Sequence, residues 1–251
     1  MKKKIISLLL ITMIYISLTP ASATPEYREY RALMTSKAIS NQPAALKYGI
    51  DVSRWQGDID WEAVSETRAD FVILRAAVGA VDDEPISIDS RFREYIKGAQ
   101  EHQLEVGVYF YSYAKTVTEI RKEARFLVNL LSEFEITYPV ALDMEEEHKH
   151  YKDDPGEMAE AFLEIIMDAG YFPMLYSYKS WLEGYLIRET CREVTIWVAQ
   201  LDSPSTTYGG NYYMWQYSHT GSVSGIEGDV DLNIAFRDFG EYIRRVGLNN
   251  L

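Results

Sequence analysis

The run Tyr138–Glu145 constrains the fold of this 251-residue chain more than any other stretch. It is apolar up to Leu142 and then presents two carboxylates, Asp143 and Glu145, placed two residues apart. Alternate side chains of an extended strand point to the same face, so a strand through Glu145 would place both carboxylates on one side. An apolar strand that follows a helical stretch is typical of a parallel strand covered by helices. Ligands and chemistry collect at the carboxyl ends of such strands.

The same alternation of apolar strand and amphipathic helix runs along the chain. Two helix starts carry capping signals, an N-cap at Asp60 and a capping box at Thr116 and Glu119. We expect strands at 47–53, 71–76, 105–111, 138–145, 172–177, 195–199, 212–217 and 228–233. We expect helices from 61, over 90–102, from 116 to 131, and over 155–169, 181–189 and 238–246.

This order of elements predicts an α/β fold with a parallel sheet, closed into an irregular, TIM-like (β/α) barrel. The barrel would occupy residues 47–247 as a single domain. No G-x-G-x-x-G motif follows the first strand, so a dinucleotide-binding open sheet has no support.

The amino-terminal residues have the layout of an export signal. Residues 1–23 hold three lysines, an apolar stretch and then Ala21-Ser22-Ala23, which predicts a signal peptide with its cleavage site. An uncleaved membrane anchor is the alternative. Residues 24–46 are polar without a clean period and form a leader to the domain. We therefore expect a secreted or cell-wall-associated protein with no stable membrane insertion after cleavage.

The net charge and the cysteine content of the chain limit the classes of partner and of covalent cross-link that we expect. The formal net charge is −13, and a nucleic-acid partner is not expected, because backbone binding needs clustered Lys and Arg. Cys191 is the single cysteine, has no internal disulfide partner, and is interpreted as an inert helix residue. The pair His148 and His150 lies in a charged stretch and is interpreted as solvated. We expect a monomer with neither a metal nor a cofactor.

The ends of the expected strands carry carboxylates, aromatic rings and amides. Carboxylates that lie close together push their pKa values apart, so that one donates a proton while its neighbour stays charged. Aromatic rings stack on the C–H faces of sugars, whose hydroxyls hydrogen-bond to amides and acids. This combination predicts glycoside hydrolysis. The residues concerned are Asp51, Trp55, Tyr111, Asp143, Glu145, Tyr176, Gln200, Trp215, Gln216 and Asp231.

Several short motifs resemble, in order, those of glycoside hydrolase family 25 lysozymes, from Tyr48 to about Phe236. They are Asp51-Val-Ser-Arg-Trp-Gln-Gly57, Ile59-Asp-Trp61, Gly107-Val-Tyr-Phe-Tyr111, Leu142-Asp-Met-Glu145, Trp197-Val-Ala199, Trp215-Gln-Tyr217 and Gly228-Asp-Val-Asp-Leu-Asn233.

The resemblance implies an N-acetylmuramidase that cuts the β-1,4 bond between N-acetylmuramic acid and N-acetylglucosamine in bacterial peptidoglycan. It implies that Glu145 is the general acid and that Asp143 orients or stabilises the 2-acetamido group or the developing cation. Asp51 and Asp231 resemble the two further acidic residues of the family's site. Tyr111, Tyr176 and Trp215 resemble its aromatic walls.

Alternatives stay open at this point. The acidic stretch after Leu142 is also readable as a solvated loop. The same barrel would suit a catalytically silent glycan-binding protein or a chitinase-like glycosidase, although the complete acidic set favours the enzyme. Retention, inversion and substrate assistance are all compatible with the sequence, and substrate assistance is favoured because it suits a paired Asp and Glu. Among single residues, Trp197 is expected in the core, Trp61 is expected to pack the first helix, and Tyr109 is unassigned.

Overall fold

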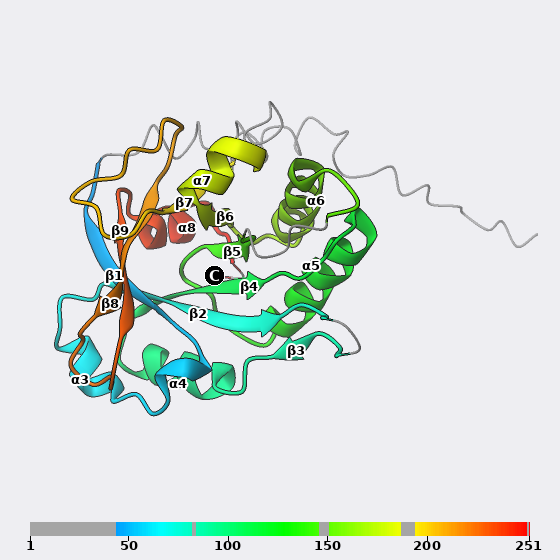
Figure 1. Ribbon diagram of the computed structural model, residues 1–251. Coiled ribbons are helices and arrows are strands. Elements are labelled where there is room, and N and C mark those ends of the chain that lie inside the picture. Colours follow the sequence, from blue (N-terminus) through cyan, green and yellow to red (C-terminus); the bar gives the residue numbers. More distant parts are fainter. Residues whose placement is uncertain (1–43, 82–83, 146–150, 187–193, 250) are drawn as a thin grey trace, which may run out of the picture.

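The computed structural model describes residues 44–81, 84–145, 151–186, 194–249 and 251 (Figure 1). The expected signal peptide, nearly all of the leader, the pair His148 and His150, and Cys191 lie outside the described residues. Within these ranges, no helix has the length and apolar character needed to cross a membrane.

The described chain forms a closed barrel with helices around it (Figure 1). The strands β1, β2, β4, β5, β6, β7 and β8 pair in parallel in that order, and β9 pairs antiparallel with both β8 and β1. A two-residue strand, β3 (Ser87–Ile88), adds antiparallel to the end of β2. The barrel strands are β1 (Lys47–Val52), β2 (Phe71–Val78), β4 (Glu105–Tyr111), β5 (Val140–Asp143), β6 (Pro173–Tyr178), β7 (Ile196–Ala199), β8 (Met214–Gly221) and β9 (Val230–Ala235).

The closed single-domain barrel confirms the expected fold class, with two corrections. The sheet is mixed, because β8 and β9 are joined by a turn without a helix, and such a connection makes neighbouring strands antiparallel. The strand expected over 138–145 is shorter, since β5 ends at Asp143 and Glu145 lies just beyond it.

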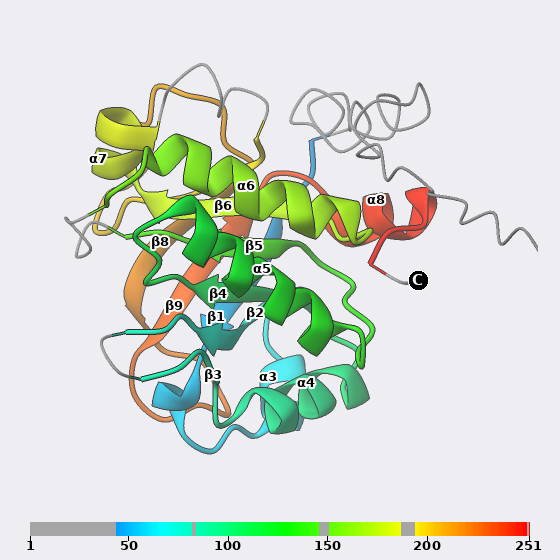
Figure 2. The same cartoon turned by 90° about the vertical axis from the view of Figure 1, so that its right-hand side faces the viewer.

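The helices form an outer layer, in which α5 and α6 lie side by side along one flank (Figures 1 and 2). The expected caps are present: Ala63 N donates to Asp60 Oδ1 at 3.1 Å and Glu119 N to Thr116 Oγ1 at 3.2 Å. In place of the helix expected over 181–189, the described residues form short α7 (Lys179–Trp181) followed by a π-helix, η4 (Leu182–Leu186), while residues 187–189 lie outside the described part of the chain. The remaining helices are η2 (Arg54–Gln56, a 3-10 helix), α3 (Trp61–Ser65), α4 (Phe92–Glu101), α5 (Val117–Leu131), α6 (Pro155–Asp168), α7 (Lys179–Trp181) and α8 (Phe239–Val246).

Aromatic rings close the amino-terminal end of the barrel. Tyr138 stacks on Phe71 at 4.5 Å between ring centroids and meets Phe239 of α8 edge-on at 5.5 Å. Phe172 also contacts Phe239, at 5.5 Å. Gly49 of β1 makes room for this plug, because a Cβ there would lie 2.4 Å from the Phe71 ring. Aromatic packing therefore closes the amino-terminal end of the barrel.

A buried asparagine fastens the chain after α8 to this plug. The side chain of Asn249 is fully buried, accepts from Phe172 N at 2.7 Å and donates to Tyr138 O at 2.9 Å. Its backbone lies in the left-handed region at φ 62°. Asparagine tolerates this conformation better than most residues and pairs two backbone groups that would otherwise be buried without partners.

We expect Asn249→Ala to lower the free energy of unfolding by about 2–4 kcal/mol, because it leaves buried backbone groups unpaired. Urea unfolding followed by tryptophan fluorescence measures the change. Asn249→Gly removes the same bonds without backbone strain and should lose most of this amount, while exposed Asn129→Ala should change little. Equal stability of Asn249→Gly and the wild type would contradict the prediction.

Candidate active site

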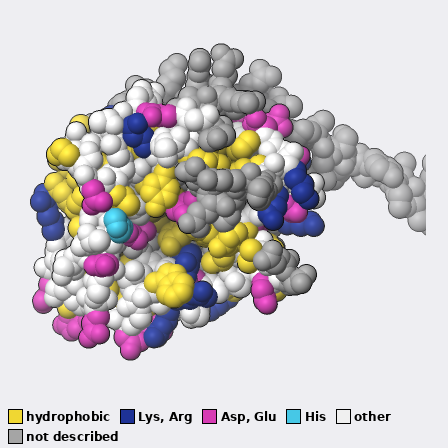
Figure 3. All heavy atoms as spheres, in the orientation of Figure 1, with side chains coloured by type: hydrophobic (Ala, Val, Ile, Leu, Met, Phe, Trp, Pro, Cys, Tyr) yellow, Lys and Arg dark blue, Asp and Glu magenta, His cyan; other side chains and the backbone are white. Residues whose placement is uncertain are grey.

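A cavity of about 430 Å³ opens at the carboxyl ends of the barrel strands. Most of the residues singled out from the sequence line it, which confirms that the fold brings them together. They are Asp51, Trp55, Tyr111, Asp143, Glu145, Tyr176, Gln216 and Asp231. On the face seen in Figure 3, acidic side chains lie among apolar ones, and Lys and Arg side chains are scattered.

Strand register sets the positions of these side chains. Asp143 is the Cα partner of Tyr111 on β4 and of Tyr176 on β6, so the three residues stand at one level of the barrel. On the opposite side, Asp51 of β1 is paired with Asp231 of β9. Carboxylates from distant parts of the sequence therefore face the same space.

The carboxylate of Asp51 is the centre of a buried hydrogen-bond network. Its Oδ2 atom accepts from Gln216 Nε2 at 3.0 Å and from Asn233 Nδ2 at 2.7 Å. Trp197 Nε1 donates to Asn233 Oδ1 at 2.8 Å, and Tyr176 Oη donates to Gln216 Oε1 at 2.9 Å. The indole is a donor only, so it turns the Asn233 amide nitrogen toward Asp51.

Burial raises the pKa of both paired acids, and the charges of neighbouring acids add to the rise. Burial first, and then the charge of Asp231, raise the pKa of Asp51 well above its ordinary value. Burial raises the pKa of Asp231 to about 6, against the lowering effect of a side-chain hydrogen bond with Asp51. Two carboxyls that hydrogen-bond each other must share a proton, so this pair holds one near neutral pH.

Asp143 and Glu145 have different surroundings within the same cavity. Asp143 is 4% exposed, and its Oδ1 atom has no hydrogen-bond partner among the described residues. Burial, followed by the charges of Glu145 and Asp51, raises the pKa of Asp143, while the Arg75 guanidinium opposes the rise. Glu145 is half-buried, and its Oε2 atom accepts from Tyr111 Oη at 3.3 Å. The pair thus combines an enclosed acid with an acid that substrate reaches more easily.

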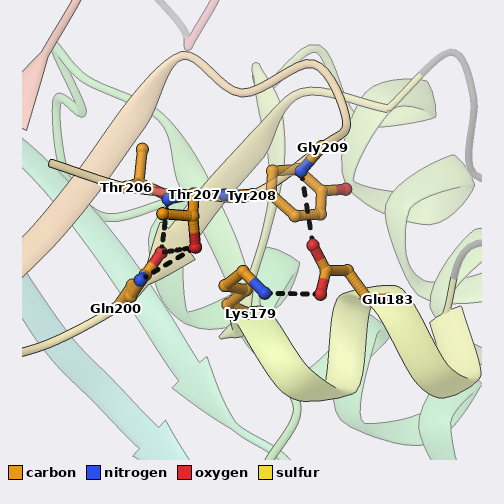
Figure 4. Close-up of polar contacts among 7 residues, drawn as sticks. All are labelled: Lys179, Glu183, Gln200, Thr206, Thr207, Tyr208 and Gly209. Carbon is orange, nitrogen blue, oxygen red and sulfur yellow. Dashed lines mark hydrogen bonds and ion pairs between the residues drawn. The ribbon is translucent and has the colours of Figure 1, made fainter.

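The structure does not place Gln200 among the residues that line the cavity. Its Oε1 atom accepts from Thr206 Oγ1 at 3.0 Å and from Thr207 N at 2.7 Å, so the side chain holds the loop after β7 (Figure 4). Glu183 fastens the same loop by accepting from Gly209 N at 3.3 Å. Gln200 therefore supports the wall that Leu201 contributes to the cavity.

Trp215 is also absent from the lining. It is 8% exposed, belongs to the core between barrel and helices, and donates from Nε1 to Gln200 O at 2.9 Å. Alternation along β8 explains this: Gln216 faces the cavity, so its neighbour Trp215 points outward.

Other tryptophans agree with their expected places. Trp55 is 73% exposed, lies on the cavity rim just after β1, and has the Arg54 guanidinium 4.9 Å from its ring centroid. Trp61 is buried and contacts Tyr95 edge-on, which ties α3 to α4. Trp197 is a core residue as expected, but it also forms part of the cavity floor.

Several cavity residues were not identified from the sequence as site candidates, and those with polar side chains include Arg75, Tyr109, Tyr178 and His219. Alternation with Tyr111 and Tyr176 would have found Tyr109 and Tyr178. A charged side chain inside an otherwise apolar strand is the signal for Arg75. It forms an ion pair with buried Asp89 at 2.6 Å.

Among the described residues, no group of three or more His, Cys, Asp and Glu side chains is arranged to hold a metal ion.

Comparisons with known proteins agree with this geometry. A family model described as glycosyl hydrolases family 25 matches residues 50–226. The autolytic lysozyme of Clostridium acetobutylicum is 27% identical over 185 residues, which cover 74% of this chain and 54% of that protein. The chain thus spans about half the length of that relative.

Solved structures show the same barrel. The modular autolysin LytC of Streptococcus pneumoniae, in complex with a synthetic peptidoglycan ligand, matches with a TM-score of 0.65 and 26% identity, over 75% of this chain and 46% of that one. The bacterial lysozyme of Streptomyces coelicolor matches with a TM-score of 0.64 and 23% identity, over 81% of this chain and 97% of that one, and supports the fold.

The raised pKa of Asp231 predicts a pH dependence of stability. The folded state holds this proton up to about pH 6, whereas the unfolded chain releases it near 3.8, so the free energy of unfolding should fall as pH rises between these values. Asp231→Asn should remove this fall and be more stable than the wild type above pH 6 by about 1–3 kcal/mol. Urea unfolding from pH 4 to 8 measures it, with exposed Glu227→Gln as the control. A constant difference across this range would refute the assignment.

Proposed function

The chain belongs to glycosyl hydrolases family 25, and we propose that it hydrolyses peptidoglycan as an N-acetylmuramidase, acting outside the cell or at its wall. The observation that carries the proposal is the gathering of Asp51, Asp143, Glu145 and Asp231 in one cavity walled by tyrosines. Two carboxyl groups in different surroundings are what acid-catalysed cleavage of a glycosidic bond requires. The family membership and the peptidoglycan ligand of the similar autolysin support the choice of polymer.

In the proposed reaction Glu145 is the general acid. It is the more accessible of the two acids on this side of the cavity, and the Tyr111 hydroxyl fixes its orientation. It would protonate the oxygen that links muramic acid to glucosamine as the bond to C1 breaks. A positioned acid of this kind accelerates the step by roughly 10²–10⁴-fold.

Asp143 is assigned to the 2-acetamido group of the muramic acid. Its Oδ1 atom is a buried acceptor with no hydrogen-bond partner in the described part of the chain, and an acetamido N–H would be a suitable donor for it. Held in this way, the acetamido carbonyl oxygen attacks C1 while the leaving oxygen takes the proton of Glu145. Water then attacks C1 and returns a proton to Glu145, the C1–O bond to the acetamido group breaks, and the configuration is retained.

Asp51 and Asp231 are proposed to stabilise the positive charge that develops at the sugar ring. Their shared proton leaves the pair with a negative charge near neutral pH, and the amides of Gln216 and Asn233 hold Asp51 in place. Fixed charges in an enclosed site act more strongly than charges in water. Trp55 and Tyr111 offer aromatic surface for the sugar faces.

Mass spectrometry of fragments released from purified peptidoglycan tests the bond that is cut. The wall is reduced with borohydride before digestion and again afterwards, so that new ends are distinguished from old ones. We expect new reducing ends on muramic acid. New ends on glucosamine would overturn the bond assignment, and binding of several wall types without release of fragments would favour a silent glycan-binding protein.

Paired variants test the roles of the acids. Glu145→Gln should abolish measurable turnover with little loss of stability, because the amide keeps the shape and carries no transferable proton. Asp143→Asn should lower kcat nearly as much, since an amide presents an NH₂ group that does not accept from the acetamido N–H. Rates of fragment release measure both, with Glu227→Gln as the matched control on the surface. Near wild-type activity of Glu145→Gln would remove that residue from its role.

A further inference from the structure

We propose that Glu123 of α5 is a positioning residue for the catalytic pair, which fixes the segment just after Tyr111 through its carboxylate. The inference rests on the proposed function, because the residues that it positions are the proposed acid and its partner. Burial of a carboxylate on an apolar helix face is unfavourable unless its partners compensate for the lost hydration. Glu123 is 2% exposed on the apolar face of the helix, next to Ala124 and between Ile120 and Leu127.

The carboxylate faces three donors of one short segment. Ser112 Oγ donates to Glu123 Oε2 at 2.5 Å, and the backbone N–H groups of Tyr113 and Ala114 also donate to it. Gly79, in the segment after β2, leaves room for the charge, since a Cβ there would lie 2.1 Å from Glu123 Oε1. An ionised carboxylate satisfies all these donors, whereas an amide of the same shape would present an NH₂ group to some of them.

The segment held in this way supports the catalytic pair from two sides. Ser112 N donates to Asp143 O at 3.0 Å, which fixes the end of β5. Tyr111, the residue before Ser112, donates from Oη to Glu145 and contacts the Tyr113 ring at 5.1 Å. A shift of residues 112–114 would therefore move the proposed acid and the backbone of its partner together.

The Glu123 clamp, in which the carboxylate accepts from Ser112, Tyr113 and Ala114, is also sensitive to pH. Burial raises the pKa of Glu123 to about 7, although the bonds from Ser112, Tyr113 and Ala114 lower it, and the charge of Glu119 adds to the rise. Burial, followed by the charges of Asp143 and Glu123, raises the pKa of Tyr151, which therefore lies near both acids. Glu123 also lines a cavity of about 370 Å³ together with Lys115, Lys122 and Glu119.

When Glu123 is protonated, one of its carboxyl oxygens becomes a hydrogen-bond donor instead of an acceptor. Of the groups that face Glu123, only the Ser112 hydroxyl is able to reverse and accept a hydrogen bond, because backbone N–H groups only donate. The intact clamp is thus the ionised form. We expect kcat of the wild type to fall as pH drops through about 7.

Steady-state kinetics from pH 5 to 9 on solubilised peptidoglycan strands test the proposal. Glu123→Gln should lower kcat by about 10- to 100-fold with KM within about threefold, because small displacements of reacting groups have effects of this size. Its profile should also lack the inflection that Glu123 gives the wild type. Ser112→Ala should keep that inflection but move it to higher pH, because a donor to the charged form is lost.

Two controls separate positioning from stability. Leu130→Ala, buried farther along the same helix, should lower stability and leave kcat and the pH profile unchanged. Glu157→Gln, an exposed position on α6, should change neither. A Glu123→Gln variant that keeps the wild-type kcat and inflection would overturn the positioning role. A wild type that releases no fragments would instead overturn the proposed function, so the two failures are distinguishable.

Discussion

The structure depends on the burial of an acid inside the barrel and on the amides that make this burial possible. Asp51 lies on the barrel axis side of β1, where an unpaired carboxylate would be strongly unfavourable. Gln216 and Asn233 satisfy it, and they are themselves fixed by the Tyr176 hydroxyl and the Trp197 indole. Each partner comes from a different strand, so one network couples β1, β6, β7, β8 and β9. The antiparallel β9 supplies two polar groups of the cavity region, Asn233 and Asp231.

The barrel interior is divided into an apolar base and a polar mouth. Phe71, Tyr138, Phe172 and Phe239 fill the base with rings that pack against one another. The inward positions change from apolar to charged along single strands, as from Ile73 to Arg75 on β2. This division concentrates the unfavourable charges at one end, while the apolar contacts of the base and of the helix layer stabilise the whole.

The sequence predicted most of this because its signals are local. Apolar strand runs, caps at Asp60 and Thr116, and carboxylates at strand ends are patterns within a few residues, and the observed elements and the cavity follow them. Gln200 and Trp215 were grouped with the cavity by their closeness to strand ends, yet loop contacts and strand alternation turn them elsewhere. Asn249 acts through hydrogen bonds to residues 77 and 111 positions away in the sequence, and Glu123 acts through a bond to the segment after β4. No local pattern predicts such pairings. A charge within an apolar helix face was nevertheless a visible signal at Glu123.

The balance of charge in the polar part of the cavity determines which of its carboxyl groups are protonated. Arg75 is the cation that faces Asp143 and Tyr109, but its guanidinium is already paired with buried Asp89 at 2.6 Å. The four cavity carboxyls are therefore only partly compensated, and burial together with mutual repulsion raises the pKa of Asp51, Asp143 and Asp231. An acidic site that retains protons near neutral pH is suited to protonate a leaving group. It also attracts a developing cation, and both properties arise from the same excess of negative charge in an enclosed space.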